Sequence, residues 1–171
     1  SSDLAVAGVA NFNTKGVKLT SLIGSRNLVA TISSPSAISK TNTVTVTFGA
    51  ATKLAIFTQA AGAVNGVDFT TQPVIKVQDI SGNTVADSTA NVEASASGVA
   101  LGGTTSKPAV NGVATFTNLK FTGTVATYTL AFNSTGLAAD SQSLALTAGA
   151  ATQLVLVQNA LGAANRHAFA T

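Results

Sequence analysis

Side chains that could take part in catalysis are few in this chain and stand far apart. His167 is the only histidine, it follows Arg166, and cysteine is absent. Nucleophilic catalysis needs a nucleophile, a base and an orienting group within reach of one another. Glycoside hydrolysis needs two carboxyl groups at a defined separation, and the spacing of Asp68, Glu93 and Asp140 gives no reason to pair them. We therefore predict that the chain is not an enzyme and has no catalytic residues.

One stretch does concentrate oxygen-bearing side chains. Calcium takes about six to eight oxygen ligands, and Asp79, Asn83 and Asp87 are candidate calcium ligands, with Ser81 between them. The same residues also suit a turn, because Gly82 can supply a positive φ while Asp and Asn side chains bond the turn's own backbone. Such a turn needs no metal. We accordingly expect no metal and no other cofactor.

The elements that would position these residues belong to an internal repeat. The segment 49–54 reads GAATKL and returns at 149–154 as GAATQL, which is a period of 100 residues. Upstream of this anchor the offset grows in steps of two residues, which preserve strand parity and keep inward side chains inward. We predict that 1–49 is the C-terminal part of one unit, 50–148 is a complete unit, and 149–171 supplies the N-terminal strands of a following unit.

Apolar and polar residues alternate with a period of two in short stretches that turn residues separate. Thr43–Phe48 alternates cleanly, and no stretch keeps the 3.6-residue period of a helix. The odd spacing from Phe116 to Leu119 predicts a bulge or break near Asn118. About six to eight strands in the complete unit predict an all-β fold, a β-sandwich. The expected strands lie at 9–12, 17–19, 28–32, 43–48, 53–58, 73–78, 84–86, 90–97, 113–121, 128–132 and 144–146. The Gly-, Ser- and Thr-rich stretch 98–111 is expected to be a loop with one short edge strand.

Composition excludes several classes of protein. The chain is 46% hydrophobic and 9% charged, which is too apolar for a disordered linker. The formal net charge is +3, but Lys and Arg occur singly, and without a basic cluster we expect no nucleic-acid partner. No apolar run reaches the ~18 residues that a membrane-spanning helix needs, so we expect no membrane insertion within this chain. No signal peptide is visible, so the targeting segment of a secreted protein would lie outside this chain.

Three motifs follow one another in the complete unit. Residues 77–85 read VQDISGNTV, residues 111–116 read NGVATF, and residues 128–132 read YTLAF. They resemble the V-x-D-x-x-G-N-x-V, x-G-x-A-x-F and Y-T-V-x-A motifs of bacterial Ig-like repeats of the invasin and intimin type. The last two recur in weaker form in 1–48. The resemblance implies an Ig-like β-sandwich repeat of an extracellular protein at the bacterial cell surface. The receptor-binding tip domains of that family have no counterpart here.

Two classes of function remain open. The first is a structural repeat that forms a stalk, filament or lattice, in which each unit contacts chiefly neighbouring repeats or copies of itself. Lysine is sparse, which leaves edge strands unguarded, and neighbouring copies could share a sandwich by strand addition. The alternative is an adhesin module that binds a carbohydrate or another surface. Such sandwiches usually present exposed aromatic rings, whereas this chain has no Trp and a single Tyr. Its sequence indicates no particular glycan or host ligand. We therefore favour the structural repeat.

Overall fold

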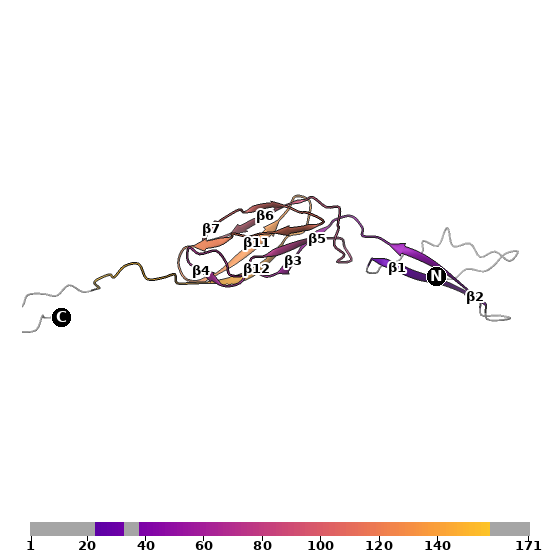
Figure 1. Ribbon diagram of the computed structural model, residues 1–171, viewed down its shortest axis with the longest axis horizontal. Coiled ribbons are helices and arrows are strands. Elements are labelled where there is room, and N and C mark those ends of the chain that lie inside the picture. The colour runs from indigo at the N-terminus through magenta and orange to yellow at the C-terminus, as the bar shows by residue number, and fades with distance from the viewer. Residues whose placement is uncertain (1–22, 33–37, 158–171) are drawn as a thin grey trace, which may run out of the picture.

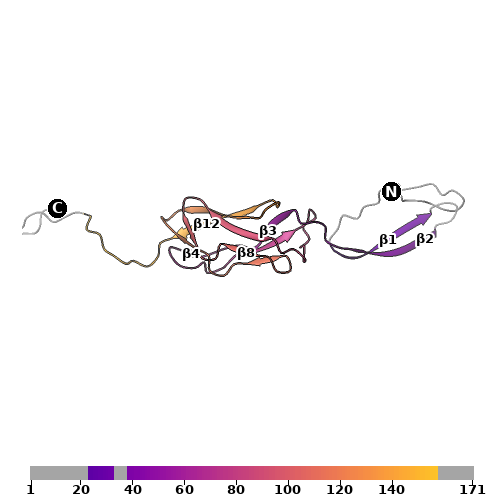
Figure 2. The same ribbon diagram turned by 90° about the horizontal axis from the view of Figure 1, so that it is seen from above.

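The structure, a computed structural model, describes residues 23–32 and 38–157. Every regular element in that part of the chain is a β-strand, which confirms the all-β prediction. No helix within it is long and apolar enough to span a bilayer. Figures 1 and 2 show a two-stranded hairpin, a sandwich and an extended segment that follow one another along one axis. The strands expected at 9–12 and 17–19, and His167, lie outside the described residues.

The strands fall into a hairpin and a sandwich. The hairpin pairs β1 (Gly24–Ile32) with β2 (Ile38–Val46) in antiparallel fashion. The sandwich spans residues 53–147. Its strands are β3 (Lys53–Thr58), β4 (Ala63–Val64), β5 (Val74–Gln78), β6 (Asn91–Ala96), β7 (Ala100–Gly102), β8 (Ser106–Pro108), β9 (Val113–Thr115), β10 (Lys120–Thr122), β11 (Thr127–Asn133) and β12 (Asp140–Thr147).

Two sheets form the sandwich. One has the order β3-β5-β9 and the other β4-β12-β11-β6-β8, while β7 and β10 pair separately. β3 and β4 follow each other in the sequence but belong to different sheets, so the first segment of the unit crosses from one sheet to the other. The register of β3 against β5 shifts between Ile56 and Thr58. A shift of this kind is a β-bulge, which bends a strand and increases its twist.

Tyr128 makes a contact that is typical of immunoglobulin-like sandwiches. Its hydroxyl group, near the start of β11, donates a hydrogen bond of 2.8 Å to the carbonyl oxygen of Thr124. In Ig-like domains a tyrosine at the equivalent corner bonds the backbone a few residues upstream. The division of the main strands between the two sheets is also that of an Ig-like sandwich. The β-sandwich prediction is confirmed.

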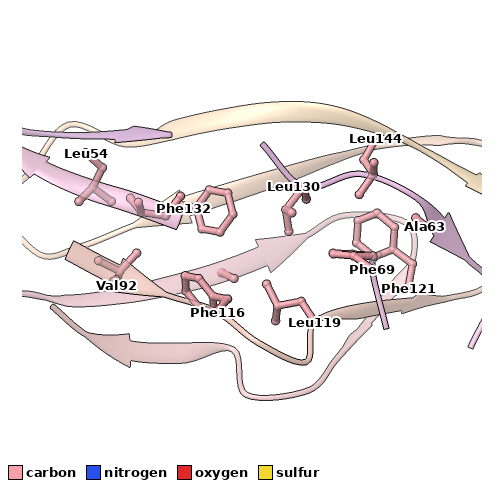
Figure 3. Packing of buried hydrophobic residues seen from close by; sticks show 14 of the residues in the cluster. Leu54, Ala63, Phe69, Val92, Phe116, Leu119, Phe121, Leu130, Phe132 and Leu144 are labelled. Carbon is pink, nitrogen blue, oxygen red and sulfur yellow. The ribbon is translucent and has the colours of Figure 1, made fainter. Parts of the chain in front are cut away.

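The core lies between the two sheets, and its side chains come from the predicted alternations (Figure 3). The break that the sequence predicts near Asn118 is present, because β9 ends at Thr115 and β10 begins at Lys120. This break lets residues on both sides of an odd spacing point inward. Fully buried side chains include Ile75, Val77, Val92, Phe116, Leu119, Phe121, Leu130 and Phe132.

Some local predictions need correction. Residues 84–86 form no strand, and only an isolated bridge joins Thr84 to Gln78. The stretch 98–111, predicted as loop with one short edge strand, contains both β7 and β8. The first strand expected after 149 is absent from the described residues, where Leu154 is fully exposed. β3, its counterpart one repeat earlier, pairs with β5, whereas residues 151–157 have no partner strand in the described part of the chain.

At the 100-residue period of the repeat, Leu28 corresponds to Tyr128 and Val44 to Leu144, so the hairpin occupies the positions expected for counterparts of β11 and β12. Tyr128 pairs with Leu144 in the sandwich, whereas Leu28 pairs with Asn42 in the hairpin. The hairpin register is therefore displaced by two residues from the repeat. Because side chains alternate with a period of two, this displacement keeps the same residues on the same face.

Burial in this core predicts a large cost for removing a central ring. Phe121 is fully buried, and its ring meets that of Phe69 edge to face with centroids 5.0 Å apart. Phe121→Ala should lower the free energy of unfolding by about 3–5 kcal/mol in urea denaturation. Phe57 is 64% exposed, and Phe57→Ala, the control, should cost less than about 1 kcal/mol. Equal losses for the two variants would contradict this assignment of the core.

Candidate functional site

Two polar residues of the described chain are buried, and both lie in one turn. Asp79 is 3% exposed and Asn83 is 6% exposed. The turn follows β5, and Gly82 has a φ of 86°, in the region that favours glycine. Burying a charged carboxylate is costly unless hydrogen bonds compensate for the lost water. The contacts of Asp79 therefore decide what this turn can do.

Asp79 accepts four hydrogen bonds. Its Oδ1 accepts the backbone N–H groups of Ser81 and Asn83, each at 2.9 Å. Its Oδ2 accepts the Asn83 side-chain amide at 2.9 Å and the backbone N–H of Gly49, also at 2.9 Å. Three of the four donors lie inside the turn, as the sequence predicts. The fourth, Gly49, lies in the segment that connects β2 to β3.

Asn83 extends the same contact to the other strand of the hairpin. Its Oδ1 accepts the backbone N–H of Ile23 at 3.2 Å, next to the start of β1. Gly49 follows the end of β2. The turn of the sandwich thus bonds the backbone at both strands of the preceding hairpin. We call Ile23, Gly49, Asp79, Ser81 and Asn83 the junction cluster.

The hydrogen bonds change the acidity of Asp79. The Gly49 N–H and then the Asn83 side-chain amide contribute most, with the backbone N–H groups of Asn83 and Ser81 adding to them. Desolvation opposes the shift. Together these effects lower the pKa of Asp79 from 3.8 to about 2. The carboxylate is therefore ionised and able to accept all four bonds over nearly the whole pH range.

The structure brings two of the three candidate calcium ligands together, and the third differs from them in its exposure to solvent. Asp79 and Asn83 are bonded to each other, while Asp87 is exposed to solvent. Both carboxylate oxygens of Asp79 already accept N–H groups, and the Asn83 oxygen accepts that of Ile23. A cation at this turn would have to replace these bonds. No group of three or more His, Cys, Asp or Glu residues gathers in the described part of the chain.

The remaining acidic residues occupy separate settings. Asp68 pairs with Lys120 at 3.2 Å on the surface. Asp140 accepts the backbone N–H of Ile56 at 2.8 Å through Oδ2. Glu93 is exposed and lines a surface pocket with mostly polar neighbours. These three carboxylates serve an ion pair, a strand contact and a solvated surface, so the described contacts give them no common site.

Known proteins give little guidance on this arrangement. The chain matches no protein-family model and no curated protein. Among solved structures it is similar to a beta-glucuronidase of Parabacteroides merdae with glycerol in its active site, at 13% identity and a TM-score of 0.44, over 68% of this chain and 15% of that chain. It is also similar to a beta-glycosidase from Bacteroides vulgatus, at 14% identity and a TM-score of 0.45, over 61% of this chain and 15% of that chain. Similarity at this level assigns no activity to the chain.

The acidity of Asp79 predicts a pH dependence of stability. Because its pKa is lower in the folded chain, its contribution is present above pH 3.8 and is lost as the pH falls through about 2. Asp79→Asn should reduce the free energy of unfolding at neutral pH and flatten its decline across this window, measured by urea denaturation at a series of pH values. Ser81→Ala keeps the backbone donor and the carboxylate, so it should decline as the parent does. An Asp79→Asn variant with the parent's slope would refute the role of this carboxylate.

Proposed function

We propose that this chain is a non-catalytic structural repeat of a secreted bacterial cell-surface protein, in which Ig-like units stack end to end as a stalk or filament. The junction cluster is the observation that supports this most directly. The Asp and Asn of the DxxGN motif bond backbone groups of the preceding segment at Gly49 and Ile23. The motif by which the chain resembles bacterial Ig-like repeats therefore also joins one unit to the one before it.

The course of the chain favours an extended array. The hairpin lies at one end of the sandwich, and the segment after β12 leaves from the opposite end (Figures 1 and 2). Units connected in this way add length with each repeat. Stability in such arrays is approximately a sum of unit and nearest-neighbour terms, so a specific contact at each junction matters for the whole array.

The edges of the complete unit also favour stacking over strand exchange. β3 bonds residue 138 on the side away from β5, through the Leu54 N–H and the Ala138 carbonyl oxygen at 2.8 Å. β8, at an edge of the larger sheet, contains Lys107 and Pro108, residue types that discourage pairing with another chain. We therefore place the contacts between units at their ends and not along the sheet edges.

The adhesin alternative has one feature in its favour. Phe57, at the bulge of β3, is 64% exposed, and aromatic rings are the surfaces on which sugars stack. However, the Lys76 ammonium nitrogen lies 3.4 Å from the centroid of this ring and covers one face. Glycan-array binding by the parent that is lost in Phe57→Ala would favour the adhesin. The structural proposal predicts no such binding.

The junction can be tested by removing one donor. The chain has no cysteine, so Ser39→Cys on the hairpin and Ser143→Cys on the sandwich permit specific spin labelling of two exposed positions. We expect a narrow distance distribution by double electron–electron resonance, because the junction cluster fixes the two parts. Gly49→Pro removes the N–H that Asp79 accepts and should broaden the distribution.

Gly49→Ala is the matched control. A Cβ atom at residue 49 would meet the nearest Asp79 atoms at 3.7 Å, an ordinary contact, and the N–H is kept. This variant should retain the narrow distribution. Asp79→Ala should reproduce the effect of Gly49→Pro without changing the connecting backbone. A parent distribution as broad as that of Gly49→Pro would overturn the proposal of a rigid stacked array.

A further inference from the structure

The first and last segments of the sandwich lie side by side and run in the same direction. β4 pairs with β12 in parallel, with Ala63 opposite Leu146. A parallel bridge also joins Lys53, at the start of β3, to Ala138. The other strand pairs in the sheets are antiparallel. We call the contact between residues 52–65 and 138–147 the terminal-strand interface.

Backbone hydrogen bonds close both ends of this interface. At one end the Leu54 N–H donates to Ala138 O at 2.8 Å, and the Ala138 N–H donates to Thr52 O at 2.9 Å. At the other end the Asn65 N–H donates to Thr147 O at 3.0 Å. Between these ends the first segment crosses from one sheet to the other, which interrupts the regular ladder.

Side chains of β12 replace the missing backbone partners in that interval. Asp140 Oδ2 accepts the Ile56 N–H at 2.8 Å. Gln142 accepts the Ala60 N–H through Oε1 and donates through Nε2 to Ala60 O, both at 2.8 Å. Its amide therefore makes the pair of bonds that an opposing backbone residue would make. The Thr147 hydroxyl adds a bond of 3.0 Å to the carbonyl oxygen of Ala63.

The direction of the chain determines how this interface meets tension. The chain enters the sandwich before β3 and leaves it after β12, at opposite ends (Figure 1). Tension along a stalk would pull the N-terminal end of β3 one way and the C-terminal end of β12 the other way. Because the two segments are parallel neighbours, they would slide past each other, and the bonds between them would be loaded together. An antiparallel hairpin pulled at its open end instead releases its bonds one after another.

We infer that the terminal-strand interface is the force-bearing element of this repeat, and that Asp140, Gln142 and Thr147 give it strength where the backbone ladder is interrupted. The inference rests on the proposed stalk for its biological meaning. Its physical content concerns the sandwich alone. It assigns these polar side chains of β12 a role in resisting extension that their effect on equilibrium stability would not reveal, because forced unfolding is governed by the unfolding rate.

The test is single-molecule unfolding of the full chain with handles across the sandwich. Ala50→Cys and Ala150→Cys are exposed attachment points, one on each side of it, in a chain without other cysteines. We expect Gln142→Ala to raise the unfolding rate at a given load about tenfold or more, because two hydrogen bonds of the loaded interface are lost. Urea denaturation of the same variant, without load, measures how far the substitution changes equilibrium stability.

Gln72→Ala is a closely matched control. Gln72 is also a half-buried glutamine whose amide bonds the backbone, contacting Phe69 O at 3.1 Å and both the N–H and O of Leu119 at 3.0 Å. These contacts lie outside the terminal-strand interface. The factor by which Gln72→Ala changes the unfolding rate should be no larger under load than without load. This should hold even where Gln72→Ala and Gln142→Ala lose equal equilibrium stability.

A milder variant keeps the inference testable if Gln142→Ala does not fold. Thr147→Val preserves the shape of an exposed side chain and removes only its hydroxyl bond, and it should raise the rate under load by about fivefold. The comparison is between Gln142→Ala, or Thr147→Val in its place, and the control Gln72→Ala. If load changed the unfolding rates of the interface variant and of the control by the same factor, the inference would be overturned. The handles span only the sandwich, so this result is independent of the junction and of the proposed stalk.

Discussion

The Asp79 carboxylate is the group on which the relation between the two parts of this molecule depends. It is buried, and it accepts N–H groups both from its own turn and from Gly49. Hydrogen bonds to a charged acceptor are stronger than those between neutral groups, and here they offset the desolvation of the carboxylate. One side chain therefore shapes the turn and attaches it to the preceding segment, so a change in that turn alters the junction as well.

Local patterns in the sequence predicted the parts of the fold that depend on local chemistry. The DISGN turn, the buried alternation of Ile75 with Val77, and the break near Asn118 all follow from neighbouring residues. Each of them needs only the period of a strand or the conformational freedom of a turn residue. For the same reason the Asp79 and Asn83 contacts within the turn were predictable, and these contacts use the oxygens that a calcium ion would otherwise bind.

Contacts between distant residues were not predictable in this way. Gly49 and Ile23 carry no side-chain signal for a hydrogen bond, since the groups that Asp79 and Asn83 accept are backbone N–H groups. Gln142 looks like any outward residue of an alternating strand, yet it bonds Ala60 across a separation of 82 residues. The backbone N–H and carbonyl groups of Ala60 require a partner because the first segment crosses between sheets there. The local sequence pattern near residue 60 does not predict this crossing. Long-range pairing therefore determines the parts of the candidate site that sequence reasoning missed.

The repeated glycines connect the two ends of the unit. A Cβ atom at Gly149 would lie 2.9 Å from the carbonyl oxygen of Asn65, too close for an ordinary side chain. A Cβ atom at Gly49 would have room, but there the N–H is bonded to the Asp79 carboxylate. Gly149 thus lies against the sandwich that precedes it in the chain, and Gly49 bonds the sandwich that follows it. In the proposed array each connecting glycine would meet both demands at once, so the sandwich before it and the sandwich after it would constrain the same residue.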